Sequence, residues 1–174
     1  MKNTLSQLLF IILTTFIFSA SSCHKDDPEP DLVPITTTGA NTMGFYVDGV
    51  PHNKKGSIKA GESSVSWGKY ADGKIEFVGG GGEPYGYLRL SFYYKPSLNT
   101  FEISLISQNT GFGEFIDDAP LGGSEYYTND TITGVLNILR LDDHIISGTF
   151  EIRLQDPITG KIIHLTDGRF DIKQ

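Results

Sequence analysis

Residues 146–154 read ISGTFEIRL, and along this stretch apolar side chains alternate with polar ones. The apolar positions are Ile146, Phe150, Ile152 and Leu154. The polar positions are Ser147, Thr149, Glu151 and Arg153. A period of two is typical of a β-strand that buries one face and exposes the other, as strands of antiparallel sheets do. The stretch therefore predicts an all-β protein with an antiparallel sheet.

The chain on both sides of this strand continues the pattern. Downstream, the turn signal DPITG at 156–160 precedes Ile163 and Leu165 on the inward face, and Asp167-Gly168 indicates a bulge or a kink. Upstream, residues 87–94 alternate again, with Leu88, Leu90, Phe92 and Tyr94 on one face and Tyr87, Arg89, Ser91 and Tyr93 on the other. These strands indicate sequential antiparallel hairpins.

The remaining segments agree with this fold class. From Met43 onward no eleven-residue window carries a helical apolar stripe, and Asp48-Gly49 is a hairpin signal. Residues 108–123 form the longest irregular segment, where a binding loop is expected. We expect residues 42–174 to form a single antiparallel β-sandwich of about nine strands, with a flattened calycin-like barrel as the alternative.

The amino-terminal residues 1–22 have the organisation of an export signal. Lys2 is followed by an apolar run of eleven residues from Leu8 to Phe18, interrupted only by two threonines. A membrane-spanning helix needs roughly 20 apolar residues, so we interpret this run as a cleaved signal peptide.

The signal ends at Cys23, the single cysteine of the chain. Residues 20–23, ASSC, resemble the bacterial lipobox, although Ala20 stands where that motif usually has leucine. The resemblance implies acylation of Cys23 and cleavage before it. A plain secretory signal is the alternative, but it would leave a lone reactive thiol in an oxidising compartment.

Residues 23–41 are expected to form an acidic tether rich in proline and threonine. Lys25, Asp26 and Asp27 resemble the export signal of surface lipoproteins in Bacteroidetes-type Gram-negative bacteria. A solvated acidic linker is the alternative explanation. Pro28, Pro30 and Pro34 should stiffen the segment, since proline fixes its own backbone angle.

The charge balance limits the partners. Without residues 1–22 the chain carries 13 basic and 21 acidic side chains, a net charge of −8. Nucleic acid requires a basic patch that neutralises phosphate, so we expect no nucleic-acid partner. The one cysteine lies at the expected anchor, and His52, His144 and His164 lie on separate segments, so we expect neither a metal nor a cofactor. Calcium held by the paired acids at 117–118 or 142–143 is the alternative.

Three segments of the domain are similar to a known family. TGANTMGFYVDG at 38–49, SGTFEIRL at 147–154 and LTDGRFDIK at 165–173 resemble the opening and closing signatures of uncharacterised Bacteroidetes-type surface lipoproteins. The resemblance implies a small, lipid-anchored all-β protein. It implies no activity and no site.

The candidate ligand surface consists of aromatic residues on the outward face of one strand. Tyr85, Tyr87 and Tyr93 lie opposite the core positions of the strand at 87–94, and Asp117 and Asp118 supply an acidic rim. Exposed aromatic rings bind glycans or proteins, whereas cover by a second sheet or by the 108–123 segment would give them a structural role. Thr131, in the sequence DTI, resembles an acceptor of bacterial O-glycosylation.

We expect a non-enzymatic binding or structural module in the outer membrane, exposed at the cell surface, held by its acylated amino terminus and contacting a glycan or a surface protein. The alternative is a surface glycan hydrolase that uses Asp117 or Asp118 together with Glu114 or Glu125, because glycosidases need two carboxyl groups flanking the scissile bond. The four-glycine run at 79–82 lacks the lysine of a phosphate loop and is interpreted as a flexible turn.

Mass spectrometry of the mature amino-terminal peptide tests the anchor. The resemblance to the lipobox predicts a peptide that begins at Cys23 and carries acyl chains. Such chains would hold the protein in the membrane, because each buried methylene adds about 0.8 kcal/mol of membrane affinity. A free thiol at Cys23, or a leader that is still attached, would contradict this expectation.

Overall fold

The computed structural model describes residues 31–56, 63–82, 84–93, 102–106, 111–117 and 123–174. Within these ranges the chain forms eleven β-strands and no helix. The strands are β1 (Thr42–Val47), β2 (Val50–Lys55), β3 (Ser64–Lys69), β4 (Lys74–Gly80), β5 (Tyr87–Tyr93), β6 (Glu102–Leu105), β7 (Gly111–Ile116), β8 (Glu125–Tyr127), β9 (Gly134–Leu141), β10 (Ile145–Gln155) and β11 (Ile162–Lys173).

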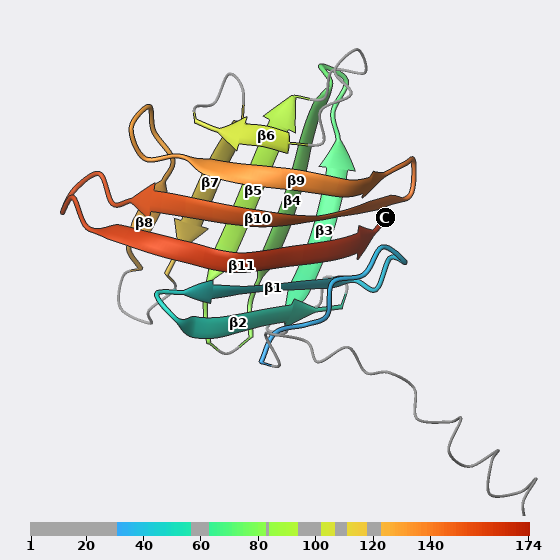
Figure 1. Cartoon of the computed structure of the whole chain (residues 1–174), viewed down its shortest axis with the longest axis horizontal. Helices are drawn as coiled ribbons and strands as arrows, with labels where there is room; N and C mark the ends of the chain where they lie inside the picture. The colour runs from blue at the N-terminus through green and yellow to red at the C-terminus, as the bar shows by residue number, and fades with distance from the viewer. Residues whose placement is uncertain (1–30, 57–62, 83, 94–101, 107–110, 118–122) are drawn as a thin grey trace, which may run out of the picture. The chain divides into compact units, whose positions relative to one another are not determined.

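All described strand pairs are antiparallel, and they form one continuous sheet. The order is β2-β1-β11-β10-β8-β7-β5-β4-β3, and β10 also pairs with β9, which in turn pairs with β6. Figure 1 shows the sheet as two layers: β9, β10, β11, β1 and β2 run across the view, and β7, β5, β4 and β3 run steeply behind them. The predicted all-β antiparallel class is confirmed, and the arrangement combines the two layers of a sandwich with the near closure of a flattened barrel.

The two ends of the strand order approach each other and nearly close the sheet. On β3, the Val65 amide donates to the carbonyl of Gly56, just past the end of β2, at 3.0 Å. The ammonium of Lys54 on β2 donates to the carbonyls of Gly81 (2.6 Å) and Pro84 (2.7 Å). Lys54 is fully buried, and burial lowers the pKa of its ammonium to about 8. This lysine therefore ties the edge strand β2 to the turn between β4 and β5.

Aromatic rings join the two layers in the core. Phe77 of β4 stacks on Phe170 of β11 with ring centroids 4.2 Å apart. Phe45 of β1 meets the edge of Phe115 of β7 with ring centroids 6.2 Å apart, and within its own layer it lies 5.9 Å from Phe150 of β10. Each ring is almost completely buried, and burying a side chain of this size contributes about 1.5–3 kcal/mol. The apolar face predicted from the alternation at 146–154 therefore faces the core.

The β10–β11 ladder bends where glycines face phenylalanines. Gly148 lies opposite Phe170, and Phe150 lies opposite Gly168, immediately before a register shift between Phe150 and Ile152. Asp167 adopts a left-handed conformation with φ of 52°. The bulge predicted at Asp167-Gly168 is confirmed.

The prediction of an irregular segment over residues 108–123 is wrong in part, because β7 occupies residues 111–116. Glycines take two positions of this strand where space is limited. A Cβ atom on Gly111 would lie 2.9 Å from Leu105 Cδ2, and one on Gly113 would lie 3.3 Å from Leu90 Cδ2. Two of the three inward positions of the strand are therefore glycines, where a large apolar side chain would normally mark the alternation. Asp118 lies outside the described residues.

Residues 31–41, the end of the expected tether, pack against the sheet. Leu32 and Val33 are buried, and the carboxylate of Asp171 on β11 accepts hydrogen bonds from the amides of Thr38, Gly39 and Ala40 at 2.8–3.1 Å and from the Thr36 hydroxyl. Burial alone would raise the pKa of this carboxyl, but these hydrogen bonds lower it below its ordinary value. We call residues 32–40 the strap.

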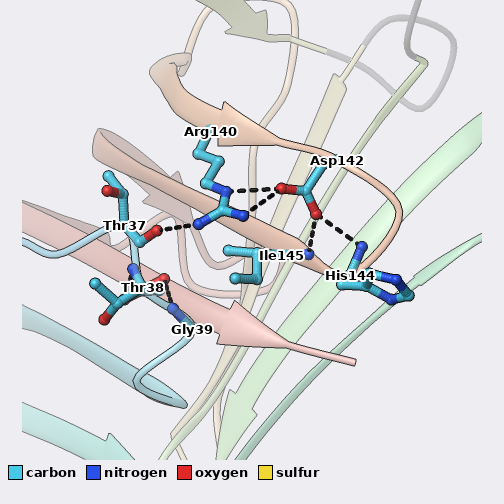
Figure 2. Close-up of polar contacts among 8 residues, drawn as sticks. Thr37, Thr38, Gly39, Arg140, Asp142, His144 and Ile145 are labelled. Atoms are coloured by element: carbon cyan, nitrogen blue, oxygen red, sulfur yellow. Dashed lines mark hydrogen bonds and ion pairs between the residues drawn. The ribbon is translucent and has the colours of Figure 1, made fainter.

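A second set of contacts fastens the strap to the β9–β10 hairpin, as Figure 2 shows. Arg140 Nη1 donates to the Thr37 carbonyl at 2.7 Å, while its Nε and Nη2 reach the Asp142 carboxylate. Asp142 also accepts from the amides of His144 and Ile145. These contacts lower the pKa of Asp142 to about 2. The packed region thus begins at Leu32 rather than at Thr42.

His52 of β2 is a buried histidine whose ring lies among phenylalanines. It stacks on Phe45 with ring centroids 5.4 Å apart and meets the edge of Phe115 at 5.8 Å. Its Nδ1 atom has no hydrogen-bond partner among the described residues. Burial, with a smaller contribution from the Lys54 charge, lowers the pKa of His52 to about 4, because the imidazolium is poorly solvated there.

Acidification from pH 6.5 to pH 4 is expected to destabilise the fold through His52. In this window the unfolded chain binds a proton that the folded chain does not. The free energy of unfolding therefore decreases as the pH is lowered, by on the order of 2 kcal/mol. Urea unfolding across the window should show that His52→Phe, which keeps the ring contacts, removes most of this fall. The matched control is His144→Gln at an exposed position. Equal pH dependence in the two variants would refute the assignment.

Candidate binding groove

The outward face of β4, β5, β7 and β8 carries a row of side chains that faces away from the core. Backbone pairing places Val78 opposite Arg89, Arg89 opposite Glu114, and Glu114 opposite Tyr127. Side chains at directly paired positions of one face contact each other. The sequence therefore builds a continuous row across four strands, with a cation and an anion at its centre.

Arg89 and Glu114 form a partly buried ion pair in this row. Arg89 Nη1 lies 3.1 Å from Glu114 Oε2, while Arg89 Nη2 lies 3.5 Å from the Tyr87 hydroxyl. The Arg89 guanidinium also lies over the Tyr87 ring, 5.6 Å from its centroid. The hydrogen bond to Tyr87 and the nearby charge of Glu114 raise the pKa of Arg89, although its partial burial opposes them. Arg89 Nε and Glu114 Oε2 lack aligned hydrogen-bond partners among the described residues, so charge proximity holds the pair.

A groove of about 610 Å³ opens beside this pair. Arg89, Ile106, Phe112, Glu114, Tyr127, Thr128, Asn129 and Asp130 line it. The sheet branches here, because β10 pairs with β9 as far as Ile152 and with β8 at Gln155. Ile106 comes from one branch and Tyr127 from the other. The groove is thus a consequence of β10 changing its partner strand.

The aromatic wall of the groove is fixed by contacts of its own. Phe112 and Tyr127 stack with ring centroids 5.8 Å apart and an interplanar angle of 28°. The Tyr127 hydroxyl donates to the Glu125 carboxylate, and this hydrogen bond raises the pKa of Tyr127 to about 12. The hydroxyl hydrogen of Tyr127 is thus used by Glu125, and the phenol oxygen can still accept a hydrogen bond from a ligand.

The rim of the groove at residues 129–132 is a tight polar turn. Asn129 Oδ1 accepts from the amides of Thr131 and Ile132 and from the Thr131 hydroxyl, at 2.8–2.9 Å. Asn129 Nδ2 donates to Gln155 Oε1 at 3.1 Å. An Asx turn of this kind orders the backbone without a ligand. Thr131, the proposed glycosylation acceptor, is exposed next to this rim.

The structure brings only part of the predicted tyrosine surface together. Tyr87 is half-buried, and its ring covers Gly80, where a Cβ atom would lie 2.7 Å from Tyr87 Cδ2. Tyr85 is 50% exposed and Tyr93 is 37% exposed, and none of the three tyrosines is among the residues that line the groove, although Tyr87 contacts the lining residue Arg89. Asp117 is exposed just after β7. Cys23, Lys25, Asp26, Asp27 and Asp118 lie outside the described residues.

Sequence reasoning missed the two rings that line the groove. Phe112 belongs to β7, whose glycines at inward positions hide the apolar alternation of a strand. Tyr127 belongs to β8, which has only three residues. Fifteen positions separate them in the chain, and the β7–β8 pairing brings them together. The sequence signal for this strand face was the spacing of Phe112, Glu114 and Ile116 at every second position.

The described carboxylates of the hydrolase alternative occupy different environments. Glu114 is paired with Arg89, Glu125 accepts from Tyr127, and Asp117 is exposed beyond the end of β7. Of these three, Glu114 alone lines the groove. The structure thus shows where each carboxylate lies, and the hydrolase remains a prediction.

Within the described part of the chain, no three histidine, aspartate, glutamate or cysteine side chains gather in a way that could hold a metal ion. The same residues include no helix of the length and hydropathy needed to span a membrane. Comparisons with protein-family models, with curated proteins and with solved structures give no match to this chain.

Proposed function

We propose that this protein is a lipid-anchored module of the bacterial outer membrane, displayed at the cell surface, that binds a glycan or a surface protein without transforming it. The observation that carries the proposal is the groove beside the Arg89–Glu114 pair, with the stacked Phe112 and Tyr127 rings as its wall. The chain would then belong with the Bacteroidetes-type surface lipoproteins that its terminal segments resemble.

The amino-terminal sequence supports the location. Acylation of Cys23 would hold the protein in the membrane, and Lys25, Asp26 and Asp27 would direct it to the outer surface. Since the strap begins at Leu32, the segment from Cys23 to Leu32 can span at most about 30 Å. A protein held so close to its membrane would meet ligands at the cell surface rather than far from it.

The ordering of the groove supports a binding role. Its rings and its ion pair are held by contacts within the protein, so binding would freeze few side chains. Immobilising a flexible side chain on binding costs about 0.5–1.5 kcal/mol of conformational entropy, and a side chain that is already ordered avoids this cost. Rigid aromatic rings supply contact area at especially low entropic cost.

The overall charge supports a partner that is not a nucleic acid. A net charge of −8 without residues 1–22 repels a polyanion such as nucleic acid. Glycans and surface proteins carry no such requirement for a basic patch. These two classes therefore remain as the proposed partners.

Glycan and peptide arrays probed with the full-length protein in detergent test the proposal. We expect at least one class of array ligand to be captured, and the double variant Tyr87→Ala/Tyr127→Ala to weaken capture by about tenfold or more. The control is Ile162→Ala, an exposed position on β11 in the other layer. Thermal unfolding should show that both variants are folded. Capture of no ligand, or equal capture by the double variant and the wild type, would disprove the binding role.

A further inference from the structure

We infer that the groove recognises neutral pyranose units of an oligosaccharide, an inference that rests on the binding function proposed above. It selects one ligand class from the two that the proposal allows. Three properties of the groove carry the inference: its charge, the pairing of its strands and the hydrogen-bonding groups that it offers.

The charges of the described residues in the groove disfavour an anion. Among these lining residues Arg89 is the single cation, and Glu114 already neutralises it. Asp130 adds a carboxylate that has no side-chain partner in the described residues, and Glu125 lies next to the wall. An acidic sugar or a phosphate would therefore meet net negative charge, which costs binding energy.

β7, the strand that carries Phe112 and Glu114, leaves little free edge for an extended peptide. It is paired with β5 along its whole length, and its other side is bonded to Thr128 at Gly113 and paired with β8 from Glu114 to Ile116. Peptides that add a strand to a sheet need a row of unpaired backbone donors and acceptors. A ligand that lies against β7 is therefore recognised by side chains.

Those side chains match a hydroxylated ring. The Tyr127 oxygen and the Asp130 carboxylate can accept, whereas the Arg89 terminal nitrogens and the second Asn129 amide hydrogen can donate. A sugar hydroxyl both donates and accepts, so it can use both kinds of partner. A pyranose also has an apolar face of C–H groups that can pack against Phe112 and Tyr127, as apolar surfaces pack on aromatic rings.

Isothermal titration calorimetry of the full-length protein in detergent tests the inference with oligosaccharides of matched length. The neutral probes are cellohexaose, maltohexaose and mannohexaose, and the charged probes are hexagalacturonate and the chitosan hexamer. We expect at least one neutral hexamer to bind, and hexagalacturonate to bind at least about tenfold more weakly than that hexamer.

Variants of Tyr127 place the ligand in the groove. Tyr127→Ala should weaken binding of the neutral hexamer by about tenfold or more, while Tyr127→Phe, which keeps the ring, should stay within about threefold of the wild type. Tyr70→Ala is the control, since Tyr70 is exposed at the end of β3 and does not line the groove. Unfolding midpoints of all three variants establish that they are folded.

The possible outcomes separate this inference from the broader proposal. Binding of hexagalacturonate or the chitosan hexamer alone, or of no hexamer, overturns the inference. If the arrays show instead that a peptide is captured and that Tyr87→Ala/Tyr127→Ala abolishes the capture, the binding function stands and the glycan inference fails. Neutral binding that Tyr127→Ala leaves unchanged excludes the groove as its location.

Discussion

Two phenylalanine rings packed against two glycines across the β10–β11 ladder are the contact on which the rest of this structure depends. Phe150 faces Gly168, where an added Cβ would lie 2.3 Å from the ring, and Phe170 faces Gly148, where it would lie 2.7 Å away. Only glycine leaves space for the rings at these positions. Phe150 then reaches Phe45, and Phe170 stacks on Phe77 of the opposite layer. The two longest strands can therefore bend over a core that both layers share.

The length of β10 connects the core to the candidate groove. β10 is long enough to pair with β9 along its first part and with β8 at its end, so the sheet branches instead of continuing as one ladder. The branch leaves Phe112 and Tyr127 on an outer surface beside the Arg89–Glu114 pair. At the other end of the strand order, Lys54 joins β2 to the β4–β5 turn. The groove is thus a property of the strand topology rather than of a mobile loop.

Local sequence signals correctly predicted turns and strands whose conformation is set by neighbouring residues in the chain. Asp48 and Gly49 have φ of 49° and 86°, as the two-residue hairpin turn requires, and β2, which contains Pro51, ends the strand order as an edge strand should. Features that depend on contacts between distant parts of the chain could not be predicted from the sequence. β2 reads VPHNKK, a polar sequence, yet His52 and Lys54 are buried because the near closure of the sheet covers them.

The site was harder to predict than the fold for the same reason. The alternation at 87–94 placed Tyr87 and Arg89 outward correctly, but it could not show that Glu114 and Tyr127 would lie in the same row. Their meeting depends on the register of three strands from separate parts of the chain. The packing of the strap could not be predicted from the sequence either. Its hydrogen-bond acceptor, the buried Asp171, lies 131 or more positions away in the chain from the strap amides that donate to it.

A double-mutant cycle between Gly168 and Phe150 tests the central contact most directly, with unfolding by urea as the measurement. Gly168→Ala should cost about 1–3 kcal/mol through overpacking, and the cost should fall by at least about 1 kcal/mol when Phe150→Leu has removed the ring. Gly68→Ala serves as the reference, because no atom lies within 4 Å of the added Cβ. A Gly168→Ala protein as stable as the Gly68→Ala protein, or a cost that is the same with and without the Phe150 ring, would contradict the account.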